Sequence, residues 1–303
     1  MKALQIDNLI KKYNQNLVLD NVNLDINKWD FFGLLGYNWA GKTTLISILT
    51  DLTRKTSWDI NIFEYNIDNN FLKAKKKIWV VPQEYNFDIF AKVEEIPILQ
   101  WGFYGIPHSV AKERTKYYLK KLDLWDKKDK RVRELSGGMK RRLMIVRALI
   151  HQPELLILDE PTAWVDVELR QSMRDFLQEL NINGTTILLT THYLEEAETL
   201  CNKIAILQEW KIIEQSTTKD LLSRLEQECF VLDLETPINK IPEELKDFSV
   251  SINHKYEIEV YLKKQHTLNN LFSILEKHNI KVLSMKNKSN RLEQLFLRLT
   301  KNK

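Results

Sequence analysis

Glycine is scarce in this chain. Only eight of its 303 residues are glycine, whereas average usage of about 7% would give about 21. Tryptophan is equally frequent, with eight residues. No internal repeat or low-complexity segment accompanies this bias, and the hydrophobic content of 44% is ordinary for a globular protein.

Cysteine and long apolar runs are also lacking. Cys201 and Cys229 are the two cysteines, and they form no spaced metal or redox motif, so we expect reduced structural thiols, in keeping with the cytosol. No run of about 18 uncharged apolar residues could span a membrane. The start, Met1 to Asp7, alternates like a strand and does not resemble a signal peptide. Any attachment to a membrane must therefore come through a partner.

Neither sign of charge dominates. The 45 basic and 41 acidic residues leave a net charge of +4, which gives little support for nucleic-acid binding. Basic clusters at 73–77 and 127–133 are best explained as solvated faces, although orientation toward anionic lipid headgroups is an alternative. The length suffices for a full α/β domain and a smaller one.

The segment Gly36–Thr44 fits the phosphate-binding pattern GxxxxGK[ST]. An apolar run at 31–35 before it predicts a buried strand, and 43–49 after it predicts a helix, which is the context this motif requires. Backbone N–H groups would face phosphate oxygens, Lys42 would reach the terminal phosphates, and the Thr43 hydroxyl would take one Mg²⁺ position. Taken alone, the segment could also be a glycine-rich turn.

Two further apolar runs end in polar side chains. The run 155–158 is followed by Asp159, placed to hold Mg²⁺, and Glu160, placed to polarise an attacking water. A core strand followed by a polar turn is an equally good reading of that run alone. The run 186–191 ends at His192, and a lone histidine there is usually structural. However, His192 follows the third predicted strand that ends in polar side chains, and this favours a contact with the γ-phosphate.

Ser136 predicts an N-cap for a helix through Leu149. An alternative interpretation of this segment is an ordinary capped helix with no ligand. Gly137 and Gly138, however, would let backbone N–H groups approach an anion closely.

The order of these motifs along the chain, with Val81-Pro82-Gln83 between the phosphate loop and Ser136, resembles that in the ATP-binding subunit of ABC transporters. The similarity covers residues 1–220. The sequence around the motifs, including 82–87 and 191–198, is similar to the drug- and polysaccharide-export branch of the family. It is most similar to YadG-type ATPases, and there the similarity extends nearly to the C-terminus.

The resemblance implies roles for individual residues. Gln83 would touch Mg²⁺ and the water, Glu160 and His192 would act in hydrolysis, and Thr43 and Asp159 would complete the metal site. Tyr13 would stack on adenine, and Asp166 would cross the dimer. The implied nucleotide-binding set is Tyr13, Gly36, Asn38, Gly41, Lys42, Thr43, Thr44, Ser136, Gly137, Gly138 and Asp166.

The resemblance also implies an architecture and partners. The fold would be an α/β P-loop NTPase cassette over 1–220, with an antiparallel β subdomain and a helical subdomain at about 85–150. Separately, a composition shift after Thr217-Thr218 and the strand and helix patterns beyond it indicate a small accessory α+β domain at 221–303, with a regulatory or dimer-supporting role. Two cassettes, as a homodimer or heterodimer, would close around ATP and Mg²⁺. They would drive a separate multi-span permease from the inner face of the cell membrane, with export favoured over import and no nucleic acid bound.

The sequence departs from the family pattern at several tryptophans. Tyr37 replaces the usual proline and Trp39 the usual glycine of the loop, and Trp164 replaces a glycine beside Asp166. Related sequences also tend to have glycine at four other positions, Trp29, Trp58, Trp79 and Trp210. Because Trp and Gly codons can differ by one base, a decayed gene or an altered reading is a reasonable hypothesis.

Two alternatives to an active transport ATPase follow. A degenerate cassette would fold but bind ATP poorly, acting as a structural or binding subunit. A soluble ABC protein acting on ribosomes or DNA is disfavoured, because such proteins carry two cassettes or a long coiled coil, and no heptad run interrupts 45–155.

Periodicity predicts the remaining elements. Strands are expected at 2–8, 17–25, 31–35, 78–82, 155–159, 186–190, 203–207, 230–234, 249–252, 256–262 and 280–284. Helices are expected at 109–122, 138–150, 168–180, 194–201, 218–228, 267–278 and 290–300.

Overall fold

The computed structural model describes residues 1–57, 59–162, 167–225, 227–263, 266–288 and 290–301. The chain divides into two compact units, Met1–Thr217 and Thr218–Lys303. No helix in these described ranges is both long enough and apolar enough to cross a membrane.

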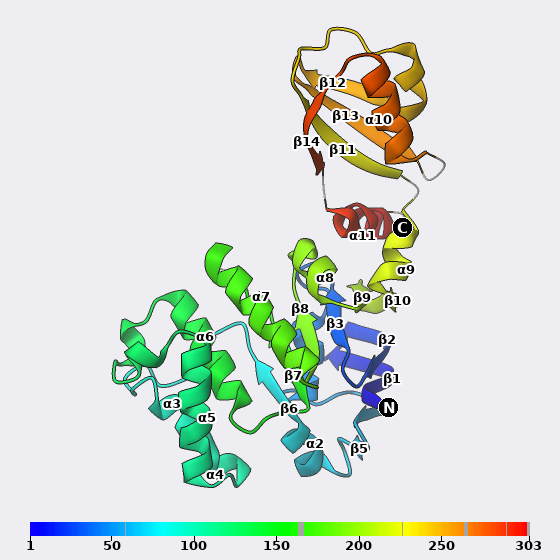
Figure 1. Ribbon diagram of the computed structural model, residues 1–303. Coiled ribbons are helices and arrows are strands. Elements are labelled where there is room, and N and C mark those ends of the chain that lie inside the picture. Colours follow the sequence, from blue (N-terminus) through cyan, green and yellow to red (C-terminus); the bar gives the residue numbers. More distant parts are fainter. Residues whose placement is uncertain (58, 163–166, 226, 264–265, 289, 302–303) are drawn as a thin grey trace. The chain divides into compact units, whose positions relative to one another are not determined.

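A six-stranded sheet forms the centre of the first unit (Figure 1). Its order is β10-β9-β3-β8-β7-β6, and every pairing is parallel except that of β10 with β9. The strands are β3 (Phe31–Leu35), β6 (Ile78–Val81), β7 (Leu155–Asp159), β8 (Thr186–Thr190), β9 (Lys203–Gln208) and β10 (Lys211–Thr217). All residues of β3, β7 and β8 are buried, which explains their continuous apolar runs.

A second, antiparallel sheet has the order β2-β1-β4-β5. Its strands are β1 (Lys2–Tyr13), β2 (Asn16–Asn27), β4 (Ile60–Ile62) and β5 (Tyr65–Asn66). The inward residues of β1 and β2 share one apolar core with α1 (Lys42–Leu49) and with Phe32 and Leu34 of β3. This shared core fixes the start of α1, and therefore the phosphate loop, against both sheets.

The helices between β6 and β7 gather beyond the β6 edge of the central sheet (Figure 1). They are α3 (Glu95–Ile98), α4 (Gln100–Tyr104), α5 (His108–Lys121), the short 3₁₀ segments η1 (Trp125–Lys127) and η2 (Val132–Glu134), and α6 (Gly137–Leu149). The other helices of this unit are α2 (Phe71–Lys77), α7 (Val167–Ile182) and α8 (Leu194–Leu200). The α3, α5 and α6 helices pack on one another, so α6 holds its Ser136 end on a rigid bundle.

The second unit is an α+β domain with the antiparallel sheet order β12-β13-β11-β14. Its strands are β11 (Gln227–Leu234), β12 (Val250–His254), β13 (Glu257–Lys263) and β14 (Val282–Asn287). Its helices are α9 (Thr218–Ser223), η3 (Glu243–Phe248), α10 (Leu268–Lys277) and α11 (Arg291–Lys301). Leu232, Ile258 and Val260 of the sheet share a core with Leu271 and Leu275 of α10.

The α/β cassette with its antiparallel and helical parts is confirmed. The expected helix at 218–228 is confirmed only as far as Ser223, where α9 ends, and its last part is wrong because β11 begins at Gln227. The segment has helical spacing, but from Gln227 onward its backbone pairs with β13, and from Phe230 onward with β14 as well. Such pairing is a long-range effect that local periodicity does not report.

Candidate nucleotide site

The phosphate loop lies between β3 and α1, and two of its glycines are required by close contacts. A β-carbon on Gly36 would lie 2.4 Å from the carbonyl oxygen of Leu207. Gly41 has a φ of 107°, and a β-carbon there would lie 2.9 Å from the carbonyl oxygen of Val18. A side chain at either position would push the loop away from β9 or β2.

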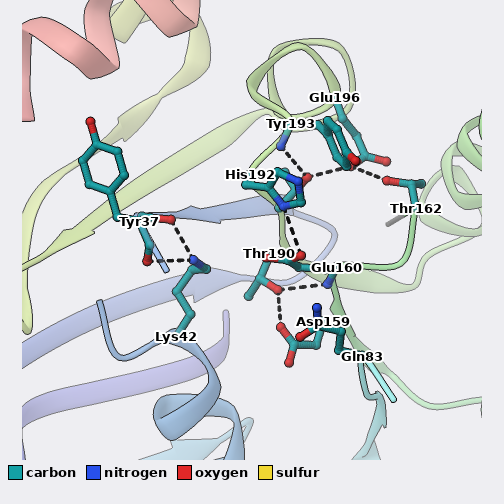
Figure 2. A network of polar contacts seen from close by, with 12 residues as sticks. Tyr37, Lys42, Gln83, Asp159, Glu160, Thr162, Thr190, His192, Tyr193 and Glu196 are labelled. Carbon is teal, nitrogen blue, oxygen red and sulfur yellow. Dashed lines mark hydrogen bonds and ion pairs between the residues drawn. The ribbon is translucent and has the colours of Figure 1, made fainter. Parts of the chain in front are cut away.

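Lys42 already points into the loop (Figure 2). Its ammonium donates hydrogen bonds to the carbonyl oxygens of Gly36, at 2.7 Å, and Tyr37, at 3.2 Å. Burial lowers the pKa of Lys42, while Glu160 and Asp159 act in the opposite direction. Both printed hydrogen bonds of this buried ammonium go to neutral carbonyl oxygens, so the group is well suited to gain an anionic ligand.

Asp159 ends β7 and Glu160 follows it, and both are fixed by Thr190 at the end of the neighbouring β8. The Thr190 hydroxyl donates to Oδ1 of Asp159 at 2.5 Å, and the Glu160 N–H donates to the Thr190 carbonyl at 3.1 Å. Burial raises the pKa of Asp159, and the Thr190 hydrogen bond opposes the rise. A cation bound beside this buried carboxyl group would favour its charged form.

Glu160 and His192 form a direct pair. Nδ1 of His192 lies 3.0 Å from Oε2 of Glu160, with the carboxylate buried and the imidazole half-exposed (Figure 2). Glu160 has a φ of 48°, in the left-handed region that non-glycine residues rarely adopt. This unusual backbone conformation at the strand end aims the carboxylate toward His192, and such strain is typical of functional sites.

Lys42, Glu160 and His192 line one cavity of about 630 Å³. Its walls are Val18, Asn38, Trp39, Gly41, Lys42, Thr43, Thr44, Gln83, Glu160, His192 and Tyr193. An adjoining cavity of about 540 Å³ shares Thr43 and Gln83 with it and is also lined by Asp159. The structure thus gathers a buried ammonium, a hydroxyl, two carboxyls and an imidazole beside a loop shaped by glycines.

Comparisons with known proteins agree with this geometry. The ABC transporter family model matches residues 19–163. The linearmycin resistance ATP-binding protein of Bacillus subtilis is 34% identical over 98% of each chain, and the Nod factor export ATP-binding protein I of Cupriavidus metallidurans is 38% identical over 72% of each. The chain belongs to the ABC transporter family. The structure of cbiO1 from Clostridium perfringens, part of the ABC transporter complex cbiONQ, matches with a TM-score of 0.67 and 26% identity, over 74% of this chain and 91% of that one.

The predicted resemblance to ATP-binding subunits of ABC transporters is therefore confirmed, and the fold is that of their P-loop ATPases. The names of the two sequence relatives describe resistance and export. Roles of individual residues in this ABC cassette stay predictions.

Two predicted parts of the ABC site, the Ser136 end of α6 and Tyr13, do not line this cavity in the part of the chain that the structure describes. Ser136 caps α6 by accepting a hydrogen bond from the Met139 N–H at 3.3 Å, and Ser136 and Gly137 are exposed. Tyr13 ends β1 with the Lys11 ammonium 4.3 Å from its ring centroid. Asp166 and Trp164 fall outside the described residues.

Arg141 was missed by sequence reasoning. This buried α6 residue donates to the carbonyl oxygens of Pro82, at 2.6 Å, Gln83, at 2.9 Å, and Glu160, at 3.2 Å. It therefore ties the Gln83 segment to the backbone of Glu160. Its neighbours in the sequence, Lys140 and Arg142, are also basic, so nothing in the local sequence sets Arg141 apart, and only its buried position on α6 distinguishes it.

Glu196 is a second residue that the sequence did not reveal. It is fully buried at the start of α8, and its Oε2 accepts hydrogen bonds from the hydroxyls of Thr162, at 3.0 Å, and Thr191, at 2.9 Å. The Thr191 oxygen in turn accepts from the Tyr193 N–H at 3.0 Å. Glu196 thus links the segment after Glu160 to the segment that carries His192 (Figure 2).

Glu196→Ala should destabilise the protein by about 2–3 kcal/mol, because it leaves two buried hydroxyls without an acceptor. Glu196→Gln keeps an acceptor and removes a charge that burial disfavours. Burial raises the pKa of Glu196, so the folded state holds its proton to higher pH than the unfolded state does. The parent should therefore lose stability relative to Glu196→Gln as pH rises above the unfolded pKa.

Urea unfolding of the three proteins between pH 4.5 and 8 measures this difference. A gap between parent and Glu196→Gln that does not change with pH, or an alanine variant as stable as the parent, would contradict the role given to Glu196.

Proposed function

We propose that this chain binds ATP with Mg²⁺ in the cavity beside the phosphate loop and hydrolyses it, and that this drives a separate membrane permease in the direction of export. The observation that carries the proposal is the Glu160–His192 contact at 3.0 Å, in the same cavity as Lys42 and Thr43. A buried carboxylate paired with an imidazole suits a group that orients and polarises a water molecule.

The residues present fit both nucleotide and metal. Gly36 and Gly41 leave room where a β-carbon would collide with backbone, and the Lys42 ammonium faces the same loop. Thr43, Gln83 and Asp159 supply the oxygen ligands that Mg²⁺ prefers. When bound, Mg²⁺ would neutralise charge on the phosphate oxygens.

Each polar residue then has a task of its own. Lys42 would exchange its carbonyl contacts for terminal phosphate oxygens, and backbone N–H groups at the start of α1 would hold others. Glu160 would accept a hydrogen bond from the attacking water, with His192 fixing the carboxylate. Arg141 would keep Gln83 and Glu160 in register through their carbonyls.

A second cassette would complete the site. Ser136 and Gly137 are exposed at the start of α6, which packs against α3 and α5. Their backbone N–H groups are therefore available to a phosphate held by a partner. The partner would be a second copy or a relative of this chain. We infer that Thr218–Lys303 is an accessory domain that supports this dimer or its regulation.

Two relatives have names that refer to resistance and export, and these names support the proposal that this chain is a subunit working with a permease at the inner face of the cell membrane. Co-purification of the tagged chain from membranes should recover a multi-span protein. Recovery of ribosomes or DNA instead would contradict this part of the proposal.

Ser136→Arg should abolish ATP-dependent dimer formation while leaving nucleotide binding to the single chain unchanged. The arginine would cap the end of α6 with a bulky cation and close the approach to its N–H groups. Analytical ultracentrifugation with Mg²⁺-ATP measures the dimer, in a Glu160→Gln background that is expected to preserve the nucleotide. Ser251→Arg, on the exposed β12 strand, is the matched control, and equal dimer formation by both variants would refute the shared site.

A further inference from the structure

Three tight turns of this chain share one backbone feature. In each, the second of the two central residues is a tryptophan with positive φ: Trp29 at 68°, Trp39 at 75° and Trp210 at 68°. The turns at 27–30 and 37–40 are closed by hydrogen bonds of 3.2 and 3.1 Å from the fourth residue to the first. The third joins β9 to β10, where Lys211 pairs with Gln208.

Turns of these types are built for glycine at that position. Glu209 and Trp210 both have positive φ, which is the pattern of a type I′ hairpin turn with its Asn-Gly or Asp-Gly preference. In the other two turns the positive φ falls on the second central residue alone, as in type II turns, which favour glycine there. A β-carbon in left-handed backbone lowers the population of that conformation by a factor of about 5 to 30.

The indole rings at positions 29 and 39 are mostly exposed to solvent, and the ring at position 210 is partly buried. Trp39 is 95% exposed, Trp29 68% and Trp210 42%. It is the backbone that makes specific contacts. The Trp29 N–H donates to the Thr186 hydroxyl at 3.0 Å, and the Trp210 carbonyl accepts from the Asp20 N–H at 2.9 Å.

Trp125 shows the opposite behaviour. It lies in η1 without positive φ, and the ammonium groups of Lys116, Lys120 and Lys128 lie 5.8, 5.9 and 5.6 Å from its ring centroid. Here the ring itself makes the contacts, as expected where tryptophan is the intended residue. The contrast separates two kinds of tryptophan within one chain.

We propose that positions 29, 39 and 210 are glycine positions, and that the codon translated there as tryptophan, which differs from the codon at position 125, is read as glycine in the cell that makes this protein. A shortage of glycine with an equal number of tryptophans is what a systematic reading difference produces. Random decay of a gene would not select three turns that specifically require glycine while Lys42, Asp159, Glu160 and His192 stay in place.

At position 39 the inference rests on the proposed function and deepens it. Glycine there would remove a large side chain from the wall of the cavity and let the loop backbone approach phosphate oxygens. Positions 29 and 210 line neither of the two cavities described for the nucleotide site, so they test the assignment independently of ATP.

The first experiment measures stability. Trp29→Gly and Trp210→Gly should each raise the folding equilibrium constant about threefold to tenfold, because relief of the left-handed β-carbon exceeds the entropy that glycine adds to the unfolded chain. Trp125→Gly, the matched control, should lower it. Lower stability in both turn variants would overturn the assignment.

The second experiment reads the residues directly, by mass spectrometry of the protein purified from its own cells. Trypsin cleavage after Lys28 and Lys42 gives one peptide that contains positions 29 and 39, and cleavage after Lys203 and Lys211 gives another with position 210. Glycine is expected at all three positions and tryptophan in the peptide 122–127. Tryptophan at all of them would refute the proposal in favour of gene decay.

ATP titration of Trp39→Gly separates the two claims. Tighter ATP binding than in the parent supports both. If the turn variants gain stability and the native peptides contain glycine, but Trp39→Gly binds no ATP, the glycine assignment stands and the proposed function fails.

Discussion

Glu160→Gln should lower ATP turnover by at least about 100-fold and leave ATP affinity close to that of the parent. Glutamine has nearly the same shape, but its amide cannot accept a proton from water or carry the charge that polarises it. The side chain is buried and 3.0 Å from His192, so solvent offers no ready substitute. Phosphate release and equilibrium nucleotide binding should be measured in parallel, with glycine at position 39.

His192→Ala is the companion variant. It removes the contact that orients Glu160 but keeps the carboxylate, so turnover should fall less than in Glu160→Gln. Turnover in Glu160→Gln that equals the parent would show that another group activates the water, and loss of nucleotide binding in that variant would assign Glu160 to binding.

Lys42→Met should weaken ATP binding by about 10- to 100-fold, which is the range for losing a charge-assisted hydrogen bond to phosphate. It should not weaken the fold. Burial already lowers the pKa of Lys42, and its protein partners are two carbonyl oxygens, so a methionine of similar length removes a charge that the folded state holds at a cost.

Lys12→Met, at an exposed position near the end of β1, is the matched control and should leave ATP affinity unchanged. Binding and urea unfolding of both variants distinguish a lost ligand from a damaged fold. A Lys42→Met protein that binds ATP as the parent does would remove the phosphate loop from the proposed site.

The nucleotide site could be predicted largely from local sequence, because each part is a short segment with its own physical signature. Buried parallel strands appear as continuous apolar runs, and polar side chains directly after β7 and β8 must lie at one edge of the sheet. Together with the phosphate-loop pattern, these strand ends predict that Lys42, Glu160 and His192 lie near one another.

Contacts between distant segments could not be read in the same way. Arg141 joins three carbonyl oxygens from two other segments, and Glu196 joins two hydroxyls from loops about 30 residues apart. The sequence spacing around each residue is that of an ordinary helix with charged side chains, so it does not mark either residue as special. The end of α9 at Ser223 was likewise decided by sheet pairing from Gln227.

The tryptophan turns show a third case. Composition and the family resemblance indicated missing glycines at Trp29, Trp39 and Trp210, and the positive φ angles there show independently that the backbone is suited to glycine. Residue identity and backbone conformation disagree there, and the disagreement itself is the information.

The central claim is that the cavity beside the phosphate loop holds a nucleotide triphosphate. Calorimetric titration of Mg²⁺-ATP into the Glu160→Gln protein with glycine at position 39 tests it most directly. We expect saturable binding of one nucleotide per chain, lost on adding Lys42→Met. Absence of binding in a folded protein, or binding that Lys42→Met does not affect, would contradict it.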